Sequence, residues 1–259
     1  MKILFLMLCT MTASAQLNLN NPAFLGSCLR QSSGFFPTNL PGGISAYGWW
    51  EPSRAYVTNG TVGTLPNLTS IGSAFNFTNG SAVPVPPIRQ VAALNGLDTL
   101  WFMNSQNNFM LCQSYTSAQP HEVFMVFAIT NVASSVFPLS GFVTGGSSYH
   151  RFLHNSASNK KFSIGSGGAG DAVVSQDITN AYFVLDLVFS NANTTIYTNG
   201  TKALTVSAGT SVAAGLCLGA NDGSAKPAMS FAGMCTFTNI LDTTGRSNTT
   251  FYWRNRFGI

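Results

Sequence analysis

Residues 183–202 constrain the fold more than any other part of the chain. They read Phe-Val-Leu-Asp-Leu-Val-Phe-Ser-Asn-Ala-Asn-Thr-Thr-Ile-Tyr-Thr-Asn-Gly-Thr-Lys, which gives two strand-like runs, a polar turn between them and a second turn at Asn199-Gly200. Alternating apolar positions bounded by Asn-Gly turns are typical of antiparallel strands that bury one face. The run therefore predicts a β-meander within an all-β protein.

Short strands separated by Gly, Asn and Pro recur through the rest of the chain. An aromatic strand that begins at Tyr47 stops at Pro52, and residues 55–90 offer short strands with turns at Asn59-Gly60 and Asn79-Gly80. Many short strands with such breaks favour a jelly roll, which is a β-sandwich of two antiparallel sheets. Further strands are expected at residues 99–103, 109–112, 123–129, 141–144, 149–153, 161–164, 203–207, 215–218 and 229–238.

One short helix is expected at the C-terminal end of the chain. Ser247 or Asn248 can cap its first turn, and Gly258 can end it. The side chains expected to face inward are Phe251, Tyr252 and Phe257.

The first fifteen residues have the three parts of a secretory signal. Met1-Lys2 precedes an apolar run at residues 3–11, and Ala13-Ser14-Ala15 follows it. The run is too short to span a bilayer as a helix, so we expect export without membrane insertion. The alternative is a buried first strand beginning at Met1. After the signal, residues 16–45 predict an irregular N-terminal arm, and residues 46–259 predict one β-sandwich domain.

Charged residues make up only 8% of the chain, and the formal net charge is +4. Solubility therefore depends on neutral polar groups, as is common in extracellular and virion β-proteins. A duplex-binding face normally concentrates many basic side chains, so we expect no nucleic-acid partner. Arg246, Arg254 and Arg256 do lie close together, but we expect them to complement the dipole at the C-terminus of the helix.

Four cysteines follow the signal segment, at Cys28, Cys112, Cys217 and Cys235. An even number of cysteines in an exported chain suggests disulfides, and the sequence cannot separate the three possible pairings. Free buried thiols are the alternative.

Several motifs occur in a fixed order from Asn95 onward: Asn95-Gly96, Val123-Phe-Met-Val-Phe-Ala-Ile129, Ile196-Tyr-Thr-Asn-Gly200, Leu218-Gly219, Phe231-Ala-Gly-Met-Cys-Thr-Phe237, Arg246, and Phe251-Tyr-Trp-Arg-Asn-Arg-Phe-Gly-Ile259. This succession resembles the laminin G-like, concanavalin A-like lectin/glucanase sandwich family. Such domains occur in bacterial surface proteins, secreted carbohydrate-active proteins and phage tail proteins. The resemblance implies a concanavalin A-like jelly roll with a closing helix.

Departures from that family bear on function. Asn107-Asn108 stands where the family often has two acidic residues, and calcium prefers anionic oxygen ligands, so we expect no metal there. Glycosidases of the related clan place two carboxylates close together on one strand. The glutamates and aspartates of this chain sit singly, and Asp186 is expected to face outward because Leu185 and Leu187 face the core. We therefore expect no enzymatic activity, no catalytic residue and no cofactor.

The chain does carry groups suited to binding sugars. Tyr149, His150 and Arg151 follow the Gly145-Gly-Ser-Ser148 loop, and Trp49 and Trp50 precede a turn. Aromatic faces stack on sugar rings, and neighbouring polar groups fix their orientation. We expect Trp49, Trp50, Tyr149, His150 and Arg151 to contribute to a ligand site, although strand alternation must point one of the two tryptophans into the core.

The first hypothesis for function is a non-catalytic, lectin-like recognition or adhesion module, exported to the surface or medium, that binds a glycan or surface polysaccharide. The alternative is a virion protein of the phage tail or spike type that recognises a host surface polymer. A polysaccharide-degrading enzyme is third, because fold analogy is its only support. A homo-oligomer is possible under either of the first two hypotheses.

Overall fold

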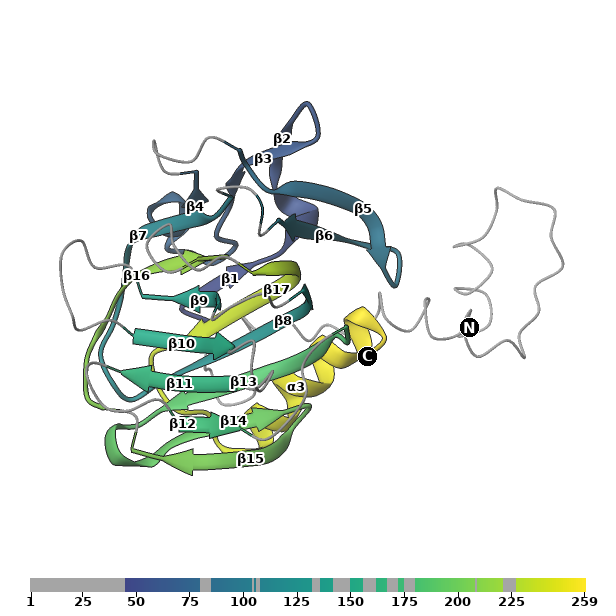
Figure 1. The fold of residues 1–259 in the computed structure, drawn as a ribbon. Helices are drawn as coiled ribbons and strands as arrows, with labels where there is room; N and C mark the ends of the chain where they lie inside the picture. The colour runs from purple at the N-terminus through teal and green to yellow at the C-terminus, as the bar shows by residue number, and fades with distance from the viewer. Residues whose placement is uncertain are drawn as a thin grey trace, which may run out of the picture. The chain divides into compact units, whose positions relative to one another are not determined.

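The computed structural model describes residues 45–79, 85–103, 105, 108–131, 136–141, 150–155, 162–166, 172–174, 180–207, 209–220 and 227–259. All of them belong to one unit of the chain, residues 35–259. In this described part, seventeen strands pair into one antiparallel network, and an α-helix follows them (Figure 1). The predicted all-β class with one C-terminal helix is confirmed.

One layer of the fold, which we call the helix-side layer, is centred on β17 and β8. Strands β1 and β6 pair with different parts of β17, and the order then continues through β8, β13 and β14 to β15. The bounds are β1 (Gly48–Trp50), β6 (Leu97–Phe102), β17 (Ala228–Phe237), β8 (His121–Asn131), β13 (Phe183–Phe189), β14 (Thr194–Thr198) and β15 (Thr201–Val206).

The facing layer, which we call the outer layer, runs from β7 through β16, β9, β10 and β11 to β12. Its strands are β7 (Met110–Ser117), β16 (Ala213–Leu218), β9 (Val136–Ser140), β10 (His150–Asn155), β11 (Phe162–Ser166) and β12 (Ala172–Val174).

Strands β3, β4 and β5 connect the two layers, and β2 pairs with β3 beside them. β5 pairs with β6 of the helix-side layer, β3 pairs with β2, β4 and β5, and β4 pairs with β7 of the outer layer. The two predicted sheets are therefore joined into one network. The connecting strands and the short 3-10 helices are β2 (Tyr56–Thr58), β3 (Thr61–Leu65), β4 (Phe77–Thr78), β5 (Ile88–Leu94), η1 (Pro52–Arg54), η2 (Gly72–Phe75) and η3 (Asn191–Asn193).

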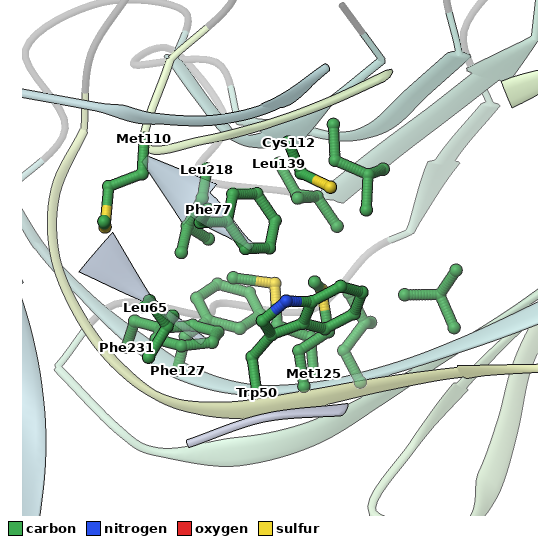
Figure 2. Close-up of a cluster of buried hydrophobic side chains, with 14 of the residues drawn as sticks. Trp50, Leu65, Phe77, Met110, Cys112, Met125, Phe127, Leu139, Leu218 and Phe231 are labelled. Atoms are coloured by element: carbon green, nitrogen blue, oxygen red, sulfur yellow. The ribbon is translucent and has the colours of Figure 1, made fainter. Parts of the chain in front are cut away.

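The main core lies between the two layers. Figure 2 shows side chains of the outer layer, among them Met110 and Leu218, facing Phe127 and Phe231 of the helix-side layer. These four side chains are fully buried. Burial of a large apolar side chain contributes about 1.5–3 kcal/mol, so contacts of this kind hold the layers together.

A second core lies on the opposite face of the helix-side layer, under α3 (Thr243–Phe257). Trp253 of the helix packs where Gly233 leaves room on β17, since a Cβ at Gly233 would come within 2.7 Å of the indole. Because both faces of this layer are covered, all seven residues of β13 are buried. The prediction that its strands bury only one face is wrong for β13.

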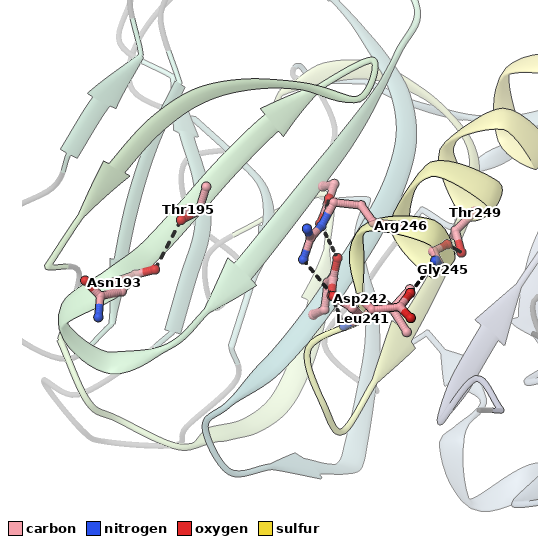
Figure 3. A network of polar contacts seen from close by, with 9 residues as sticks. Asn193, Thr195, Leu241, Asp242, Gly245, Arg246 and Thr249 are labelled. Atoms are coloured by element: carbon pink, nitrogen blue, oxygen red, sulfur yellow. Dashed lines mark hydrogen bonds and ion pairs between the residues drawn. The ribbon is translucent and has the colours of Figure 1, made fainter. Parts of the chain in front are cut away.

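The helix begins earlier than the sequence suggested. Asp242 caps it, with a side-chain oxygen that accepts a hydrogen bond from the Gly245 N–H at 2.6 Å, so the predicted caps Ser247 and Asn248 lie inside the helix (Figure 3). This start sets which side chains face the sheet, and Phe251 is 67% exposed rather than inward-facing. Gly258 ends the helix in the left-handed conformation, as predicted.

No disulfide occurs among the cysteines that the structure describes. Cys112 and Cys235 are free and buried, in agreement with the thiol alternative, and burial raises the pKa of the Cys112 thiol to about 12. Cys217 is buried as well, and Cys28 lies outside the described residues.

Candidate functional site

The two tryptophans predicted to bind a ligand are buried. Trp50 is fully enclosed in the main core, and its indole N–H donates to the Phe75 carbonyl at 2.8 Å. Trp49 points to the opposite face, where its indole N–H donates to Glu51 and its ring meets Tyr252 edge-on. Alternation predicted one inward and one outward side chain, but the covered second face buries both. Neither offers an exposed stacking surface, which corrects that expectation.

The other three predicted residues lie elsewhere. His150 and Arg151 begin β10 in the outer layer, where their backbones pair with Ser166 and Gly165 of β11. Tyr149 lies outside the described residues. Since Trp49 and Trp50 are on β1 of the helix-side layer, the structure does not bring the five residues together. Ligand binding by Tyr149, His150 and Arg151 stays a prediction.

An exposed aromatic side chain that sequence reasoning missed is Tyr56 on β2, which is 66% exposed. Its partner on β3 is Thr64, and direct partners in an antiparallel pair point to the same face. An irregularity in the register at Gly63 then places Val62 on the core side, where it is fully buried. Only short strand signals and the Asn59-Gly60 turn mark this region in the sequence, and they do not reveal the register.

The strand register extends this face from β2 and β3 to three more strands. Thr61 of β3 pairs with Ile88 of β5, Ile88 pairs with Trp101 of β6, and Thr64 pairs with Thr78 of β4. The other face of these strands carries core residues such as Val62 and Leu100. We call this side the Tyr56 face, and its residues are Tyr56, Thr58, Thr61, Thr64, Thr78, Ile88, Gln90, Thr99 and Trp101.

The Tyr56 face offers an aromatic ring beside hydroxyl and amide groups. Thr58, Thr78 and Gln90 are exposed, whereas Thr61 and Trp101 are half-buried. A ring that can stack, surrounded by neutral hydrogen-bonding groups, is the chemistry that recognises the apolar face and the hydroxyls of a sugar.

Internal hydrogen bonds hold this face in place. The Asn79 side-chain amide donates to the Val62 carbonyl at 2.9 Å, and the Arg89 backbone N–H donates to the Gly60 carbonyl. On the reverse side of β5, Asp98 accepts from the Arg89 guanidinium and from the Ala92 backbone N–H. These bonds fix the position of β5 against β3 and β6, so the face is built before any ligand binds.

A second polar cluster lies beneath α3. Arg246 Nε is 2.9 Å from Glu122 Oε1 and 3.1 Å from Asp186 Oδ2, and both carboxyl groups are buried. Arg246 also donates to the Leu241 carbonyl (Figure 3). Its guanidinium lies over the Tyr197 ring. Burial raises the pKa of both carboxyls, and for Asp186 the neighbouring charge of Glu122 adds to that effect.

This cluster corrects two interpretations of the sequence. Arg246 lies in the first turn of the helix rather than at its C-terminus, and it pairs with the sheet. Asp186 points away from the main core, but it is buried under α3 instead of facing outward, and it meets Glu122 instead of standing singly. The two carboxyls are sealed under α3, so in this conformation no polysaccharide can reach them.

Within the described ranges, no group of three His, Cys, Asp or Glu side chains could hold a metal ion. None of the helices in the same part of the chain has the length and apolar character needed to cross a bilayer.

No family model matches the chain, and no curated protein matches it. Among solved structures, the Trypanosoma rangeli sialidase in complex with sialic acid is similar, with a TM-score of 0.50 and 11% identity over 90% of this chain and 38% of that one. The botulinum neurotoxin type G receptor binding domain gives a TM-score of 0.51 and 12% identity over 80% of this chain and 51% of that one. The chain thus spans about two fifths of the sialidase and about half of the receptor-binding domain.

These similarities show an antiparallel β-fold that is shared with carbohydrate-active proteins and a receptor-binding domain. Because the neighbours include sialidases, which are enzymes, the prediction of a protein without enzymatic activity is overturned. Sequence identity at this level shows the fold alone, so no reaction is assigned to this chain.

Proposed function

We propose that the chain is a carbohydrate-recognition domain that binds a glycan across the Tyr56 face. The observation that carries the proposal is the 66% exposed ring of Tyr56, which lies near threonine side chains on a face of β2, β3, β4, β5 and β6 that also carries Gln90 at its other end. The neighbours support it, since one solved sialidase holds sialic acid and another similar domain is named for receptor binding.

In the proposed complex, a sugar ring lies on the Tyr56 ring, and its hydroxyls exchange hydrogen bonds with the nearby threonine hydroxyls. Gln90 lies toward the other end of the face, where its amide contacts a further sugar unit. Thr61 already donates its hydroxyl proton to the Thr58 carbonyl, which leaves its oxygen lone pairs as acceptors for the ligand. Several linked sugar units that contact neighbouring strands together gain avidity, as suits recognition of a surface polymer.

The test is a glycan-array screen of the chain, followed by calorimetry on the best ligand with Tyr56→Ala. Phe251→Ala is the matched control, because Phe251 is 67% exposed but lies on α3. Loss of the stacking surface should weaken binding by about tenfold or more, whereas the control should bind normally. Equal affinity of the Tyr56→Ala variant would contradict the proposed site.

The same screen should also measure whether the protein releases reducing ends from the glycan that it binds, because enzymes share this fold. Export to the surface and a place in a virion stay predictions from the sequence, and the screen tests neither of them.

A further inference from the structure

The Tyr56 face carries no charged side chain in the described part of the chain. Strands β2, β3 and β4 contain no charged residue at all, and on β5 and β6 the residues that share the face are Ile88, Gln90, Thr99 and Trp101. Thr99 is buried, and its hydroxyl bonds to Gln90. The polar groups presented to a ligand are therefore hydroxyls and one amide.

The charges nearest along these strands are turned away and neutralise each other. Arg89 pairs with Leu100, so it lies on the core side of β5, and its guanidinium is bound to Asp98. Asp98 also accepts from the Ala92 backbone N–H, and only 8% of it is exposed. Neither group can reach across the sheet to a ligand on the Tyr56 face.

A carboxylate, sulfate or phosphate on a glycan would lose hydration on this surface without gaining an ionic partner. Burying an unpaired charge is far more costly than burying a hydroxyl, and protein sites for acidic groups normally supply Arg or Lys. From this complementarity we infer that the Tyr56 face binds an uncharged glycan segment and discriminates against acidic glycans. The inference rests on the proposed function and names its ligand class.

Gly63 provides a direct test of the ligand charge. It is exposed, its φ is ordinary for any residue, and a Cβ there would meet no atom within 4 Å. A new side chain at Gly63 therefore points into solvent beside Thr64 and should leave the fold intact. Gly63→Lys and Gly63→Glu add similar bulk with opposite charge, which makes them a matched pair.

The experiment uses the whole chain against an array that holds neutral, sialylated, uronic and sulfated oligosaccharides. Calorimetry on the best ligand then compares the wild type, Gly63→Lys and Gly63→Glu at low and high salt. We expect a neutral ligand whose affinity changes less than about twofold with salt, because no ion pair forms. Both variants should weaken binding by the same factor, with circular dichroism confirming that each is folded.

The outcomes separate the inference from the proposed function. The inference would be overturned, and the proposed site kept, if the best ligand were acidic and its binding were lost in Tyr56→Ala, tighter in Gly63→Lys and weaker in Gly63→Glu. Arg54 is the exposed cation closest in sequence to Tyr56, and loss of an acidic ligand in Arg54→Gln would overturn the inference in the same way. No binding to any glycan by the folded chain would overturn both.

Discussion

His121 should make the fold sensitive to acid. It is the first residue of β8 and is fully buried, with its ring stacked on Phe189 at 4.8 Å between centroids. Nδ1 lies 3.2 Å from the Ala118 carbonyl oxygen, and a carbonyl can only accept, so this nitrogen carries the proton of a neutral imidazole. Burial lowers the pKa of His121 from 6.5 to about 4, although the hydrogen bond to Ala118 acts in the opposite direction.

The size of the effect follows from that pKa. In the unfolded chain His121 binds a proton below about pH 6.5, whereas in the folded chain it does so only near pH 4. Its contribution to stability is therefore present above pH 6.5 and is lost as the pH falls toward 4. Each tenfold change in proton affinity corresponds to about 1.4 kcal/mol, so the loss is about 3 kcal/mol. A domain of this kind is stable by about 5–15 kcal/mol, so the effect is large.

The assay is urea unfolding of the wild type and His121→Asn between pH 7.5 and pH 4. Asparagine keeps a donor near Ala118 but does not titrate, so the difference in unfolding free energy between the two proteins isolates the imidazole. We expect His121→Asn to be less stable at pH 7.5 and to recover about 3 kcal/mol relative to the wild type at pH 4. A difference that stays constant across this range would refute the reasoning.

Three further changes test the buried carboxyls, the main core and the cap of the helix. Asp186→Asn should reduce the loss of stability that the wild type shows as the pH rises above the ordinary range of an aspartate. The raised pKa of Asp186 means that folding favours its protonated form, and asparagine does not titrate. Urea unfolding from pH 5 to pH 9 checks this, with Glu122→Gln as a second variant. Gly219→Ala should lower the free energy of unfolding by about 1–3 kcal/mol, since Gly219 has a positive φ and a Cβ would lie 2.5 Å from Phe102; an unchanged melting temperature would contradict this. Asp242→Ala should cost about 1 kcal/mol in the same measurement, and Asp242→Ser should restore most of it, because the cap of α3 accepts the Gly245 N–H.

The fold could be predicted largely from local signals. Residues 183–202 form β13, η3, β14 and the start of β15, with a turn at Asn199-Gly200 as the turn residues indicated. Asn199 sits at positive φ there, and its side chain accepts the Val184 N–H. Such information lies within a few residues of the chain, which is why sequence reasoning recovers it.

The candidate site depended on information that is not local. The direction of Tyr56 follows from the register of β2 against β3, which the irregularity at Gly63 sets. The burial of Trp49 follows from α3, which starts almost two hundred residues later. Likewise, Glu122 and Asp186 meet only because β8 pairs with β13. The residue pattern within one segment does not reveal which strands pair with each other. The exposure of Tyr56 and the burial of Trp49 therefore could not be predicted from the sequence.

The double cover of the helix-side layer has a consequence during synthesis. Strands β8, β13 and β17 all leave the ribosome before α3. The face that α3 covers therefore stays exposed until the helix emerges; it carries Phe124, Val184 and the carboxyls of Glu122 and Asp186. Until residues 243–257 emerge, that face is an apolar surface with unpaired acidic groups, the kind of surface that favours aggregation and chaperone binding. This layer therefore depends on α3 for its cover, and a chain cut short before residue 243 should be far more sensitive to protease than the chain that includes the helix.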